Sequence, residues 1–180
     1  MTDSDVQAAI RAFAGARMYS PATTERWLRL APHDGDALLQ LARELRVGEN
    51  QLRDLWNWAE EIGERDRLTL SQVFASEPIA AARARELGRN DKLKLIKAAL
   101  RRVRFPQLTA VEDRLAELVR TLHLPRNVRV TLPEHLEGDQ VRIEIVAHTI
   151  GAWRTAAAAL LAAADTPAGA ELFALLGEAP

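Results

Sequence analysis

The 180-residue chain contains no cysteine, which excludes disulfide bonds, thiolate-bound metal ions and cysteine nucleophiles. Its most apolar stretch, residues 156–164, is mostly alanine. That stretch is well short of the roughly 20 apolar residues that a membrane-spanning helix needs. The first residues are acidic and lack the basic-then-apolar order of a secretory signal. These absences predict a cytoplasmic protein with no membrane contact.

Familiar catalytic and cofactor-binding motifs are also missing. The chain has no phosphate-binding P-loop and no glycine-rich dinucleotide turn, and its four histidines lack metal-ligand spacing. His135, Glu137 and Asp139 share one segment, which we interpret as an ordinary polar loop. The sequence therefore favours a binding protein with no catalytic residues, no metal and no cofactor. An enzyme stays an alternative, because catalytic groups meet in space rather than in sequence.

Apolar spacing predicts a mainly α-helical protein with one small two-stranded β-hairpin. Apolar residues recur at helical spacing through most of residues 6–122. Helix-start signals divide this stretch, including Ser20-Pro21 and a capping box from Thr69 to Gln72. The period then changes to two in residues 128–132 and 141–145, which is typical of strands. Two more helices are expected after the hairpin.

Charge is distributed unevenly over the three parts that we expect. The formal net charge is −1 overall. A helical part at 1–81 and an α-β-β-α unit at 106–180 each carry −4, whereas a basic connecting helix at 82–105 carries +7. One concentrated positive element in a near-neutral protein indicates a local binding face for an anionic partner. A solvated, arginine-rich helix explains the same charge equally well.

Residues 38–58 have the spacing of a helix-turn-helix. The small Ala42 falls where two helices would cross closely, and Val47 falls just after the turn. Arg46 stands where such turns usually have glycine, which departs from the pattern. The second helix would expose side chains that can hydrogen-bond to base edges in the major groove. These candidate nucleic-acid-binding residues are Asn50, Gln51, Arg53 and Asn57. Two ordinary core helices are the alternative, and Asp54 would repel phosphates.

All three lysines lie in residues 91–97, and arginines follow closely. On a helix, Leu93, Ile96, Leu100 and Val103 share an apolar stripe. The adjacent stripe, here called the basic stripe, is Lys94, Lys97, Arg101 and Arg104. At about 1.5 Å per residue it is about 15 Å long, enough to follow several phosphates. We predict that it holds a nucleic-acid backbone, with an acidic protein as the alternative partner.

The C-terminal order from about Val111 to Leu161 resembles the dimerisation region of ParB-like chromosome-partitioning proteins. In that region a helix leads to two strands and a closing helix, and the second strand reads like residues 140–145. The similarity covers under a third of the chain, and the ParB nucleotide-binding signature is absent, so CTP-dependent clamping is not expected. The resemblance implies a homodimer whose hairpins pair into a four-stranded sheet, with DNA contact beside it.

These features together predict a non-catalytic, DNA-associated homodimer, with RNA as an alternative nucleic acid. The main alternative is a protein-interaction or adaptor module, in which the basic helix meets an acidic partner. In that interpretation the tryptophan-rich helix offers an apolar groove. An accessory protein of an enzyme is a further alternative.

Overall fold

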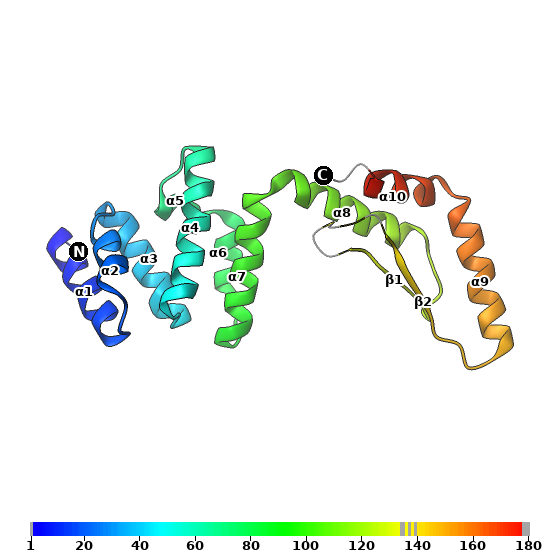
Figure 1. Ribbon diagram of the computed structural model, residues 1–180, viewed down its shortest axis with the longest axis horizontal. Helices are drawn as coiled ribbons and strands as arrows, with labels where there is room; N and C mark the ends of the chain where they lie inside the picture. The colour runs from blue at the N-terminus through cyan, green and yellow to red at the C-terminus, as the bar shows by residue number, and fades with distance from the viewer. Residues whose placement is uncertain (1, 134–135, 137, 139, 178–180) are drawn as a thin grey trace. The chain divides into compact units, whose positions relative to one another are not determined.

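The computed structural model describes residues 2–133, 136, 138 and 140–177. It confirms the predicted fold class, because helices dominate and one antiparallel hairpin forms a small two-stranded sheet (Figure 1). The chain divides into two compact units, residues 1–105 and 106–180. Each unit has its own apolar core.

The first unit is entirely helical in its described residues. Its helices are α1 (Asp3–Ala16), α2 (Pro21–Leu28), α3 (Pro32–Leu45), α4 (Glu49–Asp66), α5 (Leu70–Ala75), α6 (Glu77–Ala84) and α7 (Arg89–Arg104). The predicted start signals are confirmed, since the side chains of Ser20 and Thr69 accept backbone hydrogen bonds at the starts of α2 and α5. Gln72 completes the capping box of α5 by accepting a hydrogen bond from the backbone of Thr69.

Four aromatic rings form the centre of this unit. Phe13, Tyr19 and Trp27 have centroid separations of 5.9 to 6.5 Å, and Trp56 lies 6.5 Å from Trp27. Both tryptophans are fully buried. The indole nitrogen of Trp27 donates a hydrogen bond to the carbonyl oxygen of Gly35 at 3.1 Å. That of Trp56 has no acceptor among the described residues, although the Arg26 guanidinium lies over its ring.

The basic segment differs from the single connecting helix expected over 82–105. Helix α6 ends at Ala84, and α7 begins after Gly88, which takes the extended N-cap conformation. Helix α7 also packs into the first unit, because Leu93, Ile96 and Leu100 of its apolar stripe belong to the same core as the aromatic rings. The predicted apolar stripe is therefore confirmed, but α7 completes the first unit instead of joining two others.

The end of α4 is unusually tight. Arg67 adopts a left-handed conformation there with φ 58°, and the backbone nitrogen of Leu68 donates to the carbonyl of Gly63. A Cβ atom at Gly63 would lie 2.6 Å from the carbonyl oxygen of Leu68. Only glycine fits at position 63 without moving the backbone.

The second unit consists of one hairpin and three helices in its described residues. Its elements are α8 (Pro106–Thr121), β1 (Val128–Thr131), β2 (Arg142–Ile145), α9 (Ile150–Ala164) and α10 (Pro167–Gly177). This order confirms the predicted helix–strand–strand–helix arrangement. Val128 pairs with Ile145 and Val130 with Ile143, so the apolar side chains share one sheet face and the alternating polar residues share the other.

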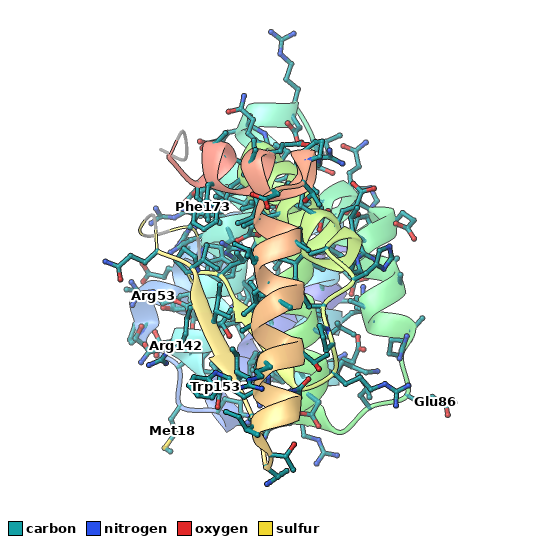
Figure 2. The ribbon with its side chains drawn as sticks, turned by 90° about the vertical axis from the view of Figure 1, so that its right-hand side faces the viewer. Met18, Arg53, Glu86, Arg142, Trp153 and Phe173 are labelled. Carbon is teal, nitrogen blue, oxygen red and sulfur yellow. The ribbon has the colours of Figure 1, made fainter. Side chains whose placement is uncertain are left out.

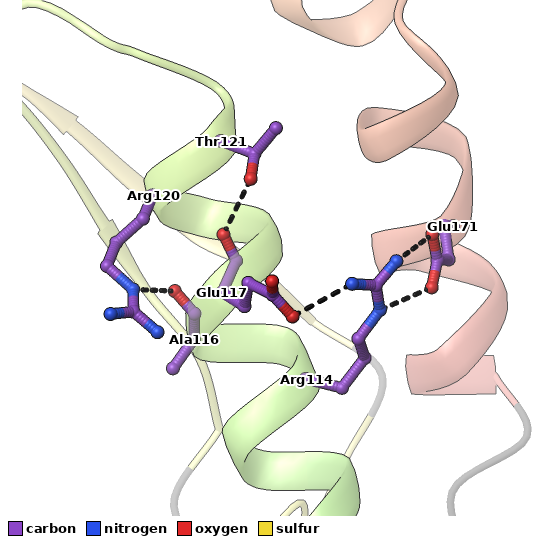
Figure 3. Close-up of polar contacts among 6 residues, drawn as sticks. All are labelled: Arg114, Ala116, Glu117, Arg120, Thr121 and Glu171. Atoms are coloured by element: carbon purple, nitrogen blue, oxygen red, sulfur yellow. Dashed lines mark hydrogen bonds and ion pairs between the residues drawn. The ribbon is translucent and has the colours of Figure 1, made fainter.

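Helices α8 and α10 are joined by leucines and by one arginine. Leu115 and Leu118 of α8 share a core with Leu172 and Leu176 of α10. Arg114 binds both oxygens of Glu171 at 2.7 Å and also contacts Glu117 at 2.9 Å (Figure 3). These hydrogen bonds from Arg114 lower the pKa of the Glu171 carboxyl group.

Helix α9 is nearly uncharged and contributes little to this core. Among its fifteen residues, only Ala156 and Ala163 are buried. No single helix in the described part of the chain has the length and apolarity needed to cross a membrane. Helices α9 and α10 reach that threshold only as a pair, which is bent by 72°.

We expect Trp27→Phe to destabilise the first unit more than Trp56→Phe. Both changes remove a similar buried volume, but only the first also removes a buried hydrogen bond, the one from the indole nitrogen to the carbonyl of Gly35. A hydrogen bond of this kind contributes about 0.5–1.5 kcal/mol. Urea unfolding at neutral pH measures both variants, and equal losses would show that the indole hydrogen bond contributes nothing.

Candidate nucleic-acid interface

Residues 38–58, for which the sequence predicts a helix-turn-helix, comprise the end of α3, a short turn at residues 46–48 and the first part of α4. Ala42, Val47 and Leu52 are all fully buried, as the pattern requires. Arg46 takes the left-handed conformation that glycine usually supplies, with φ 46° and ψ 41°. The departure in sequence is therefore compensated in structure, because the turn forms with arginine in the glycine position.

A set of hydrogen bonds from the α1–α2 connection holds this turn, and we call it the turn brace. The Arg17 guanidinium donates to the carbonyl oxygen of Arg46 at 3.1 Å, and the Tyr19 hydroxyl donates to that of Val47 at 2.7 Å. Tyr19 is buried, and this burial raises the pKa of its hydroxyl. The phenol therefore stays protonated and keeps donating at neutral pH.

The brace continues to the first residue of α4. One Glu49 carboxylate oxygen accepts a hydrogen bond from the backbone nitrogen of Ser20 at 3.1 Å, and the other accepts one from the Ser20 hydroxyl at 2.5 Å. The hydroxyl of Thr23 also donates to Glu49. These three donors lower the pKa of the Glu49 carboxyl group, with the Ser20 hydroxyl contributing most. Glu49 thus binds the capping serine of α2 while it begins α4.

The four predicted base-reading residues differ in their availability. Asn50 and Arg53 are exposed on the first two turns of α4, whereas Gln51 and Asn57 are partly buried. The side-chain oxygen of Gln51 accepts a hydrogen bond from the backbone nitrogen of Gly48 at 3.3 Å, so it helps to cap α4. Asn50 and Arg53 are therefore the members of this group best placed to reach a ligand.

The basic stripe lies largely against acidic side chains of α4. Lys97 pairs with Asp54 at 2.9 Å, and Arg104 pairs with Glu61 at 2.5 Å. Both cations also lie 5.7 Å from the ring centre of Trp58. The other two members differ, since Lys94 is exposed with Asp91 at 3.9 Å, whereas Arg101 is partly buried. The stripe thus binds α4 with at least half of its charges.

Sequence reasoning missed this pairing, although a signal for it exists. Asp54 and Glu61 are seven residues apart on α4, and their partners Lys97 and Arg104 have the same spacing on α7. Oppositely charged residues at matched seven-residue intervals form salt bridges between parallel helices in coiled coils, and the same spacing serves here. Arg65 of α4 strengthens the contact by donating to the last carbonyls of α7, at 2.6 and 2.8 Å.

The second unit exposes apolar side chains that a folded domain usually buries. Figure 2 shows two of them, Trp153 on α9 and Phe173 on α10, which are 56% and 57% exposed. Leu161 of α9 is 68% exposed and Ile143 of β2 is 46% exposed. An open apolar cleft among the hairpin, α9 and α10 is lined by residues of the same kind, including Val130 and Leu160. Large exposed apolar patches mark interaction sites.

A metal site has little support in the described residues, where no group of three histidine, aspartate or glutamate side chains is close enough to hold an ion. His135, Glu137 and Asp139 lie outside the described residues.

We expect Glu49→Gln to lower the melting temperature at pH 7, because the amide replaces a carboxylate that accepts three hydrogen bonds. The pKa of Glu49 is lowered from its ordinary value of 4.5. Its stabilising effect is therefore complete above that pH and is lost as the pH falls through the lowered pKa. The difference between the two proteins should shrink below about pH 4.5 in thermal unfolding followed by circular dichroism.

The matched control is Glu25→Gln, since Glu25 is exposed on α2 and its only described ion pair, with Arg29, is 3.9 Å long. A loss at pH 7 that is equal in both variants would contradict a special role for Glu49.

Comparison with known proteins adds no family to this geometry. No family model, no curated protein and no solved structure matches the chain. The interface must therefore be interpreted from its own residues.

Proposed function

We propose that the chain is a cytoplasmic, non-catalytic DNA-associated protein that acts as a homodimer. The α3–turn–α4 arrangement, with buried Ala42, Val47 and Leu52 and the left-handed turn at Arg46, carries the proposal. This combination supports a helix-turn-helix in which α4 is the recognition helix. In that role its N-terminal residues face base edges in the major groove.

The exposed residues of α4 suit this role at one end only. Asn50 and Arg53 offer the side-chain chemistry that reads adenine and guanine edges. Further along the helix, Glu60, Glu61 and Glu64 carry negative charge, which disfavours close approach of phosphates. DNA would therefore meet the N-terminal end of α4 and not its whole length, with Gln51 and Asn57 as lesser contributors.

Homodimerisation is supported by the incomplete core of the second unit. Ile143, Trp153, Leu161 and Phe173 are exposed in the single chain. An isolated two-stranded hairpin is marginal in water, and its strand edges carry unpaired backbone groups. A second copy offers the same strand edges and the same apolar surface. A two-fold interface would therefore pair the strand edges and cover the exposed apolar side chains together. The resemblance to ParB-like dimerisation regions agrees with this choice of partner.

We expect the wild-type protein to bind a fluorescein-labelled random duplex, with affinity that falls steeply as salt rises. The double change Asn50→Ala/Arg53→Ala should weaken that binding by about tenfold, because it removes the two exposed side chains at the reading end of α4. Fluorescence anisotropy at low and moderate salt measures both effects.

The matched control is Arg89→Ala/Asn90→Ala, which removes the same two residue types from the exposed first turn of α7. The absence of wild-type binding even at low salt would refute DNA association. Equal weakening in both variants would show that α4 is not the contact.

We expect Leu161→Glu to convert the dimer to a monomer, because it places a charge on the apolar surface that the second copy would cover. The folded unit itself should tolerate the change, since Leu161 is exposed in the single chain. Sedimentation equilibrium at micromolar protein gives the mass directly. The control is Leu87→Glu, an exposed leucine in the α6–α7 connection, which should leave the mass unchanged. A wild-type protein that sediments as a monomer would refute the dimer.

A dimeric adaptor that binds an acidic or apolar protein is the second candidate. The exposed apolar side chains of the second unit favour it, whereas the ion pairs from Lys97 and Arg104 to α4 leave less of the basic stripe for phosphates and for an acidic partner alike. The anisotropy measurement separates the two functions, since an adaptor predicts no retention of the random duplex at low salt.

A further inference from the structure

We propose that Arg17 and Arg46 hold the DNA backbone beside the N-terminal end of α4, in the role that the sequence assigned to the basic stripe of α7. This inference rests on the proposed DNA-associated function and names the phosphate contacts that the function requires. The sequence did not point to these arginines as phosphate contacts, because they lie 29 residues apart and only the fold brings them together.

The two arginines meet through the turn brace. The Arg17 guanidinium donates to the backbone carbonyl of Arg46 at 3.1 Å, which places its positive charge at the turn. Arg46 is itself exposed, and its left-handed backbone marks the point where α3 ends. Arg53 adds a third charge on the second turn of α4 and lies close enough to Glu49 to favour its ionised form. Arg17, Arg46 and Arg53 thus all belong to the region where α4 begins.

These charges are available in a way that the basic stripe is not. In the part of the chain that the structure describes, Arg46 and Arg53 make no ion pair within 4 Å, and Arg17 binds a backbone carbonyl instead of an acid. Lys97 and Arg104, by contrast, are both paired with carboxylates of α4. A phosphate at the turn would therefore meet cations that are not held in an ion pair within 4 Å in the described part of the chain.

Glu49, the acid that begins α4, is turned away from a ligand. Both carboxylate oxygens of Glu49 accept hydrogen bonds from Ser20, and one also accepts from Thr23, so its charge is directed into the α2 start. The N-terminal end of α4 adds the partial positive charge of its backbone N–H groups. The result is a positive surface at the beginning of the helix that would read bases.

A nucleic acid suits this surface better than an acidic protein. Asn50, which is uncharged and can make two hydrogen bonds to an adenine edge, is exposed among the arginines. Figure 2 shows Met18 and Arg53 projecting from the surface, and Met18 is 89% exposed. Arginines around a base-reading residue match a duplex, in which phosphates flank the groove that displays base edges.

The test replaces Arg46 with glycine, which removes the guanidinium without straining the fold. Glycine adopts the left-handed conformation of this residue more readily than arginine does. The chain offers a closely matched control in Arg67→Gly. Arg67 is also an exposed, left-handed arginine at the end of a helix, but it lies at the opposite end of α4. Both changes remove one positive charge and relieve the same backbone strain.

We expect Arg46→Gly to bind a labelled random duplex roughly 5- to 10-fold more weakly at moderate salt, with a salt slope smaller by about 0.9. Arg67→Gly should bind like the wild type, and both variants should melt at or above the wild-type temperature. Adding Arg17→Gln to Arg46→Gly should weaken binding further.

Three outcomes would overturn the inference. If the wild type binds DNA and Arg46→Gly binds equally well, DNA association stands but this contact does not. Equal weakening by Arg46→Gly and Arg67→Gly would show that net charge alone is responsible. If the wild type ignores DNA but binds polyglutamate in an Arg46-dependent way, the patch serves an acidic protein and the proposed function fails as well.

Discussion

The first unit depends on the turn brace, because it solves two problems at the same place. A left-handed arginine is disfavoured by roughly 1–2 kcal/mol, and the buried Val47 brings its carbonyl group away from water. Tyr19 donates to that carbonyl, and Arg17 donates to the one before it. Glu49 then connects the start of α2 to the start of α4. The turn can therefore expose a charged residue where a simpler design would use glycine.

Several charged side chains in this protein stabilise the packing of one helix against another, and these charges are not free to bind a partner. The basic α7 and the acidic face of α4 attract each other through Lys97 with Asp54 and Arg104 with Glu61. Exposed pairs of this kind contribute little singly, but their matched spacing selects one register between the two helices. The apolar stripe of α7 supplies the burial, and the ion pairs specify how that stripe is aligned. Net charge along a sequence is thus a poor guide to the charge that remains at the surface.

Local signals in the sequence predicted local structure well. The helix starts at Ser20 and Thr69, the apolar stripe of α7 and both strands follow from spacing within a few residues. The brace could not be predicted in this way, because its partners are 26 to 29 residues apart. The break between α6 and α7 was missed for a different reason. The segment around Gly88 has charges and helix formers on both sides, so its periodicity hides the extended cap.

The close approach at Gly63 has an evolutionary consequence. A methyl group there would collide with the Leu68 carbonyl, so selection can accept no other residue while the α4–α5 corner keeps its path. Residues that contact a ligand diverge when the ligand changes, whereas this glycine is constrained only by the neighbouring backbone. We therefore expect distant homologues to retain a glycine six positions before the capping threonine of α5. That six-residue interval is a better marker of common descent than the arginines at the turn.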